Sequence, residues 1–114
     1  MSDSVTALEQ YDACIELHRA GSVLQAVEML RKMTVEFPDF ALAYNALAAF
    51  DKKANNLAAA IENMEKYCAL ESNDPFGFSV LSAYRIAAGQ RAQAEEALGL
   101  ANELRFKAQF GEGR

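Results

Sequence analysis

The sequence has no tryptophan, one histidine, two cysteines and two prolines among its 114 residues. Cys14 and Cys68 are too few for a disulfide framework and do not form a C-x-x-C pair, so we expect two buried thiols in a reducing cytoplasm. The only histidine, His18, has no partner at metal-ligand spacing, so we expect no metal site and no cofactor. The scarcity of proline and the abundance of alanine favour helices over sheets.

Long apolar runs and excess positive charge are also missing. No stretch approaches 18 uninterrupted apolar residues, which argues against a transmembrane helix. The first residues, MSDSVTALEQ, lack the basic and apolar regions of a signal peptide, so a cytoplasmic location is expected. A net charge of −5 and a pI near 4.8 argue against general affinity for nucleic acid or for an anionic membrane.

Catalytic motifs are missing as well. The sequence contains no nucleophile elbow, P-loop, G-x-G-x-x-G or HExxH motif. Its many carboxylates occur in runs such as Glu95-Glu96, which are typical of a solvated helix face. We therefore expect no catalytic residues and a protein that is not an enzyme.

What the chain does contain is a repeat with a period of 34 residues. Gly21, Asn55 and Gly89 recur at that interval, and each is followed five residues later by an alanine. Four residues after these alanines, a large apolar residue follows each time. The aligned positions are Ala26, Ala60 and Ala94, then Leu30, Met64 and Leu98. A fixed period of this length is typical of solenoids, in which each repeat buries its apolar face against the next.

Apolar residues at helical spacing predict two helices per repeat, near residues 6–20, 22–36, 40–54, 56–71, 74–88 and 90–106. The box from Thr6 to Glu9 predicts that the first helix begins just after Thr6. Gly21, Asn55 and Gly89 are expected to end helices with a positive φ. Asp74 and Pro75 suit the cap and first turn of a helix.

These columns resemble the tetratricopeptide repeat (TPR). The first half of its pattern corresponds to Tyr44-x2-Leu47-Ala48 and Phe78-x2-Leu81-Ser82, and its second half to Ala26-x3-Leu30, Ala60-x3-Met64 and Ala94-x3-Leu98, with Pro38 closing the first repeat. The resemblance implies an all-α, right-handed superhelix of three helix-turn-helix repeats, that is, six antiparallel helices with a short tail. Residues 1–114 would form one domain, with repeats at about 7–40, 41–74 and 75–108 and a tail at 109–114.

One column departs from the TPR pattern. Where a tyrosine-like residue is expected, the three repeats carry Leu17, Asp51 and Arg85. Because equivalent residues of stacked repeats lie close together, we expect Asp51 and Arg85 to form an ion pair.

The resemblance also implies a concave groove, lined by the first helix of each repeat, that takes a hydrophobic peptide or helix of a partner. Its carboxylate-clamp positions hold Tyr11, Ile15, Ala46, Phe76 and Val80, so no clamp is present. Packing between repeats is an equal alternative for Leu42, Phe76 and Ile86. The candidate groove residues are Tyr11, Ile15, His18, Arg19, Leu42, Asn45, Ala49, Lys52, Lys53, Phe76, Val80 and Ala83.

Four of these residues form a basic row, namely His18, Arg19, Lys52 and Lys53. They would pair with acidic residues that flank a partner's hydrophobic motif. The alternative is that they only complement the negative ends of helix dipoles.

Two functions follow from this pattern. The first is a non-enzymatic adaptor or small chaperone; some type III secretion chaperones are similar in being small, acidic and TPR-built, although no motif here is specific to them. The second is self-association, as in a homodimer, through an uncapped last helix. In that case the tail KAQFGEGR either folds Phe110 back over the flank or leaves it to a second chain. The candidate oligomer residues are Leu98, Ala101, Leu104 and Phe106.

Overall fold

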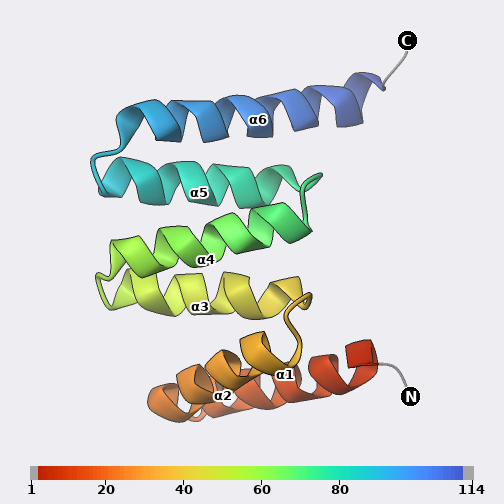
Figure 1. The fold of residues 1–114 in the computed structure, drawn as a ribbon, viewed down its shortest axis with the longest axis vertical. Coiled ribbons are helices and arrows are strands. Elements are labelled where there is room, and N and C mark those ends of the chain that lie inside the picture. Colours follow the sequence, from red (N-terminus) through yellow and green to blue (C-terminus); the bar gives the residue numbers. More distant parts are fainter. Residues whose placement is uncertain (1–2, 112–114) are drawn as a thin grey trace.

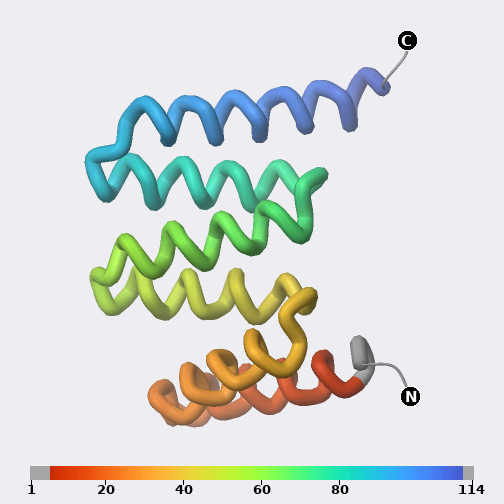
Figure 2. Tube along the Cα trace, viewed as in Figure 1, coloured from red at the N-terminus to blue at the C-terminus, as the bar shows by residue number. Residues whose placement is uncertain are grey.

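The computed structural model describes residues 3–111, with side chains from residue 6 onward. Its six α-helices are α1 (Asp3–Arg19), α2 (Val23–Glu36), α3 (Ala41–Lys53), α4 (Leu57–Leu70), α5 (Pro75–Ala87) and α6 (Arg91–Phe110). Each helix packs against the next in sequence, and residues 3–111 contain no strand. Figures 1 and 2 show the helices stacked in chain order, with α1 and α2 lying obliquely to the other four. The predicted all-α, six-helix fold is confirmed.

The three turns inside the repeats share one geometry. Gly21, Asn55 and Gly89 have φ values of 88°, 62° and 78°. In each case the next residue's amide donates a 2.8 Å hydrogen bond to a carbonyl in the last helical turn, that of residue 17, 51 or 85. This is a Schellman closure, which needs a left-handed residue at the position that glycine or asparagine occupies. The prediction of positive φ at these residues is confirmed.

The expected helix starts are partly right. Asp74 caps α5, since its Oδ1 accepts a hydrogen bond from the Phe76 amide at 3.0 Å, and Pro75 is the first helical residue. The Tyr67 hydroxyl donates to Asp74 Oδ2 at 2.6 Å, which ties the end of α4 to the start of α5. The capping box was wrong: α1 already begins at Asp3, so Thr6 lies inside the helix and cannot cap it.

The core follows the repeat. The recurring Ala26, Ala60 and Ala94 are all fully buried, as expected where two antiparallel helices approach closely. One apolar cluster joins α1, α2 and α3, and includes Cys14, Leu30, Met33 and Leu47. A second joins α3 to α6, and includes Tyr44, Met64, Tyr67, Cys68 and Leu81.

The expected ion pair between Asp51 and Arg85 is wrong. Asp51 is buried and instead accepts a hydrogen bond from Asn63 Nδ2 at 2.8 Å, with Arg31 NH2 3.9 Å from its other oxygen. Arg85 pairs with Glu65 at 2.5 Å. Arg31 and Glu65 occupy equivalent positions, as do Asp51 and Arg85, so the two repeat junctions carry the same ion pair with its charges exchanged. Asp51 and Arg85 each pair with a charged residue of the preceding helix, α2 or α4, rather than with each other.

The end of the chain also differs from expectation. Helix α6 continues to Phe110, beyond the expected end at 106. The Phe110 ring lies on the same helix as Phe106, with 4.6 Å between ring centroids, and is half exposed. It therefore does not fold back over the flank of the last repeat; residues 112–114 of the expected tail lie outside the described part of the chain.

Candidate functional site

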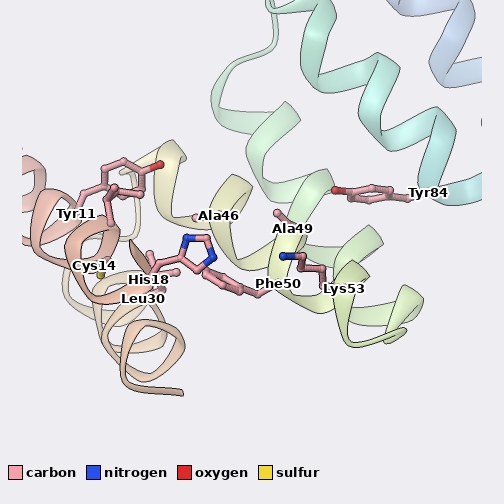
Figure 3. Close-up of a pocket in the computed structure, with 10 residues that line it drawn as sticks. Tyr11, Cys14, His18, Leu30, Ala46, Ala49, Phe50, Lys53 and Tyr84 are labelled. Atoms are coloured by element: carbon pink, nitrogen blue, oxygen red, sulfur yellow. The ribbon is translucent and has the colours of Figure 1, made fainter. Parts of the chain in front are cut away.

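A cavity of about 350 Å³ lies where α1, α3 and α5 face one another (Figure 3). Helix α1 contributes four residues to its wall, α3 also four, and α2 and α5 one each. The lining residues are Tyr11, Cys14, Ile15, His18, Leu30, Ala46, Ala49, Phe50, Lys53 and Tyr84. Most of these side chains are apolar, and the small Ala46 and Ala49 leave the space open.

Two aromatic contacts bridge α1 to the α3 side of the cavity. The Tyr11 and Phe40 rings meet at 5.8 Å and 64°, and those of His18 and Phe50 at 5.2 Å and 86°. Both are edge-to-face arrangements, which aromatic rings favour. Since α1 packs mainly along α2, these ring pairs supply aromatic contacts between α1 and the α3 side.

The inner wall is buried and chemically inert. Cys14 and Leu30 are almost completely buried, and the Cys14 thiol contacts the Met33 sulfur at 3.9 Å. Burial raises the pKa of Cys14, so the sulfur stays a thiol near neutral pH and is a poor nucleophile. The wall therefore favours apolar contact.

The lining side chains of the cavity include no carboxylate. Their polar groups are the Tyr11 hydroxyl, the Cys14 thiol, the His18 imidazole, the Lys53 ammonium and the Tyr84 hydroxyl. Figure 3 places Tyr11 on the opposite side of the cavity from Lys53 and Tyr84. Burial raises the pKa of Tyr84, so its hydroxyl remains a hydrogen-bond donor at neutral pH. The chain has a net charge of −5, whereas the end of the cavity at Lys53 carries a positive charge.

Five of the candidate groove residues line this cavity, namely Tyr11, Ile15, His18, Ala49 and Lys53. The remaining candidates do not line it; they are Arg19, Leu42, Asn45, Lys52, Phe76, Val80 and Ala83.

The surroundings of some of these other candidates are clear. Arg19 pairs with Glu16 of its own helix at 2.7 Å, and Val80 packs against the second apolar cluster. Leu42 and Phe76 are exposed outside the cavity.

Sequence reasoning missed Phe50 and Tyr84. These two residues occupy equivalent positions in successive repeats, immediately before Asp51 and Arg85. An aromatic residue at the same repeat position in both was the sequence signal that could have identified them.

A second hollow of about 390 Å³ adjoins the first. His18, Phe50 and Lys53 line both hollows. The other walls of the second hollow come from α2 and the end of α3, including Val23, Leu24 and Ala54.

The candidate oligomer residues differ in accessibility. Leu98 and Phe106 are exposed, Leu104 is half-buried and Ala101 is fully buried. Ala101 therefore cannot contact a second chain. Phe106 has the most exposed side chain of the four and lies beside Phe110.

No protein-family model and no curated protein matches the sequence. Solved structures do match the fold. A chain in the CopN–Scc3 complex superposes with a TM-score of 0.78 at 15% identity, over 89% of this chain and 59% of that one. SycD, a type III secretion translocator chaperone of Yersinia enterocolitica, matches in an alternative dimer form with a TM-score of 0.78 at 21% identity, over 98% of this chain and 82% of that one. Another SycD structure gives 0.76 and 20%, over 90% and 76% of the two chains.

The chain has the TPR-like helical-repeat fold of these chaperones. Identities at this level establish the fold alone. Within residues 3–111, no helix is both long and apolar enough to cross a membrane. The same residues contain no cluster of three or more histidine, cysteine or acidic side chains that could hold a metal ion.

Proposed function

We propose that the chain is a non-enzymatic, cytoplasmic adaptor or small chaperone that holds an apolar segment of a partner protein in the cavity between α1, α3 and α5. The observation that carries this proposal is the cavity itself, which is open, apolar and bounded by aromatic rings. Its volume lies at the lower end of the range for ligand sites, which suits one or two side chains of a longer segment.

The resemblance to SycD and to a chain of the CopN–Scc3 complex supports the same class of function. Both names concern protein partners: SycD is called a translocator chaperone, and Scc3 is described in complex with CopN. A fold that stacks helix pairs leaves a broad surface on which a segment of another protein can bind.

The test is selection from a random dodecapeptide display library on the immobilised protein. We expect enriched peptides to share leucine, isoleucine or phenylalanine positions, and to lose binding to Ile15→Glu, which places a carboxylate in the cavity. The matched control is Val35→Glu, because Val35 is 84% exposed on α2 and lines none of the hollows described. Both variants should keep the helical circular dichroism of the parent. Equal binding to the two variants would place the site elsewhere.

Self-association through α6 is the second candidate, favoured by the adjacent exposed rings of Phe106 and Phe110. Light scattering on a size-exclusion column decides it. A dimer that Phe106→Glu converts to a monomer supports this function, and a parent that stays monomeric at high micromolar concentration removes it.

A further inference from the structure

We infer that the cavity selects partner segments that carry a carboxylate next to their apolar side chain, and that Lys53 and Tyr84 bind this carboxylate. The inference rests on the proposed function and adds the chemistry of the partner to it. It assigns the bound segment a direction, with the apolar side chain toward Tyr11 and Ile15 and the acidic group toward the ends of α3 and α5.

The geometry places two donors on one side of the cavity. Lys53 is the last residue of α3, and Tyr84 comes from α5. Figure 3 shows the Lys53 ammonium and the Tyr84 hydroxyl both directed toward Ala49, which also lines the cavity. Because Ala49 has only a methyl group, an incoming group has room between the two donors.

Both donors lack a partner within the part of the chain whose side chains are described. Some cations are paired there, such as Arg19 with Glu16 and Arg85 with Glu65, whereas Lys32 and Lys52 form no ion pair among the described residues. Lys53 has no such ion pair among the described residues.

The tyrosines show the same contrast. Tyr44 donates its hydroxyl proton to the Pro38 carbonyl at 2.9 Å, and Tyr67 donates to Asp74. The Tyr84 hydroxyl, like that of Tyr11 on the other side of the cavity, makes no hydrogen bond within residues 6–111, although Tyr84 is half-buried and packs against the second apolar cluster. Half-buried tyrosine hydroxyls usually find a partner, so this one is available to a ligand.

Charge complementarity favours an acidic occupant. The cavity wall holds Lys53 and His18 and no carboxylate, while the chain as a whole has 16 acidic and 11 basic residues. An acidic segment is repelled by most of this surface and attracted here, which gives both orientation and selectivity. The nearby Asp51 does not cancel this attraction, because it is buried with Arg31 and Asn63 as its partners.

The first test uses two dyes with the same aromatic body. Anilinonaphthalene sulfonate carries an anion that stands in for the carboxylate, and phenylnaphthylamine is neutral. We expect Lys53→Gln to weaken binding of the sulfonate dye by about fivefold and Tyr84→Phe to weaken it less, while neither changes binding of the neutral dye. Lys52→Gln is the matched control. It removes the same charge at the neighbouring position, and the Lys52 side chain lines neither hollow. Equal losses for Lys52→Gln and Lys53→Gln would overturn the inference.

The second test repeats the peptide selection on the parent and on Lys53→Gln. We expect Asp or Glu beside the apolar positions in peptides selected on the parent, and the same apolar positions without the acid on the variant. Apolar peptides with no acidic preference on the parent would overturn the inference and leave the proposed function standing. Cavity-dependent binding of the sulfonate dye without acidic peptides would indicate a small anionic amphiphile, which also overturns it. No peptide enrichment and no dye binding sensitive to Ile15→Glu would remove the proposed function itself.

Discussion

Gly77 lies where α5 approaches α4 closely. A Cβ at this position would lie 2.8 and 2.9 Å from ring carbons of Tyr67, and 3.3 Å from the Cys68 sulfur. The equivalent residue one repeat earlier is Ala43, which is fully buried with its methyl group accommodated. The junction between α4 and α5 is therefore tighter at this position than that between α2 and α3, and a methyl group at residue 77 requires the Tyr67 ring to shift.

The size of the effect follows from two opposing terms. Alanine in place of glycine inside a helix normally stabilises by about 0.8–1 kcal/mol. Overpacking a close contact costs about 1–3 kcal/mol. The Tyr67 ring cannot turn away freely, because its hydroxyl is bound to Asp74, the residue that caps α5. We expect Gly77→Ala to lose up to about 2 kcal/mol of unfolding free energy, because the difference between these terms runs from about 0 to 2 kcal/mol.

Gly99 provides a control of opposite sign. It lies inside α6, and a Cβ there would have no atom within 4 Å. Gly99→Ala should therefore gain about 0.8–1 kcal/mol from helix propensity alone. Urea unfolding followed by circular dichroism measures both variants. Equal stabilisation by the two substitutions would refute the close contact at Gly77.

A double-mutant cycle locates the strain. In a Tyr67→Phe background the ring loses its hydroxyl anchor, so adding Gly77→Ala should cost less than it does in the parent. An unchanged cost would mean that the strain lies in the backbone spacing and not in the ring.

Three further outcomes are expected. Arg85→Glu should destabilise the chain because it places a carboxylate against Glu65. Adding Glu65→Arg should recover about 1 kcal/mol of unfolding free energy in urea. A double variant that is no more stable than Arg85→Glu would contradict the pairing. Burial, with help from the Asp74 charge, raises the pKa of Cys68 to about 11 from 9.0, so the folded chain holds this proton more tightly than the unfolded one. The resulting stability is complete below pH 9 and lost as the pH rises to 11, and calorimetric Tm should fall less steeply over that range in Cys68→Ala. Asn55→Ala should cost about 1 kcal/mol because of the positive φ, while Asn55→Gly should be close to neutral in the same unfolding assay.

The fold was predictable because the interactions that end its helices involve residues close together in the sequence. Gly21, Asn55 and Gly89 each close a helix through hydrogen bonds to nearby carbonyls, and the 34-residue period fixes how often this happens. The start of α1 was not predictable in the same way. A capping box inside a sequence that already favours helix does not stop the helix from extending upstream to Asp3.

The inter-repeat ion pairs show what the period alone leaves out. Equivalence placed Asp51 and Arg85 on neighbouring repeats, but it does not say which helix each side chain faces. Both lie 20 residues after a residue of opposite charge, Arg31 and Glu65, on the preceding helix. That spacing was the usable signal, because it joins the second helix of one repeat to the first helix of the next.

The candidate site was only partly visible for a related reason. Tyr11, Ile15 and Ala49 follow from assigning one concave face to all the first helices. Phe50 and Tyr84 line the cavity, but that assignment did not include their column, which lies one residue before Asp51 and Arg85. The oblique setting of α1 and α2 in Figure 1 turns the first repeat relative to the others, and a sequence period carries no information about such a rotation.

The two repeat junctions thus solve the same packing problem differently, and the difference produces the site. Between α4 and α5 a glycine lets the helices approach until a tyrosine ring fills the contact. Contact between α2 and α3 is less extensive, and two aromatic pairs rather than helix packing bridge α1 to the α3 side. A close second junction and a hollow first one thus arise from a single repeated unit. The hollow places the Lys53 and Tyr84 donors, which have no partner among residues 6–111, in a cavity wall that carries no carboxylate.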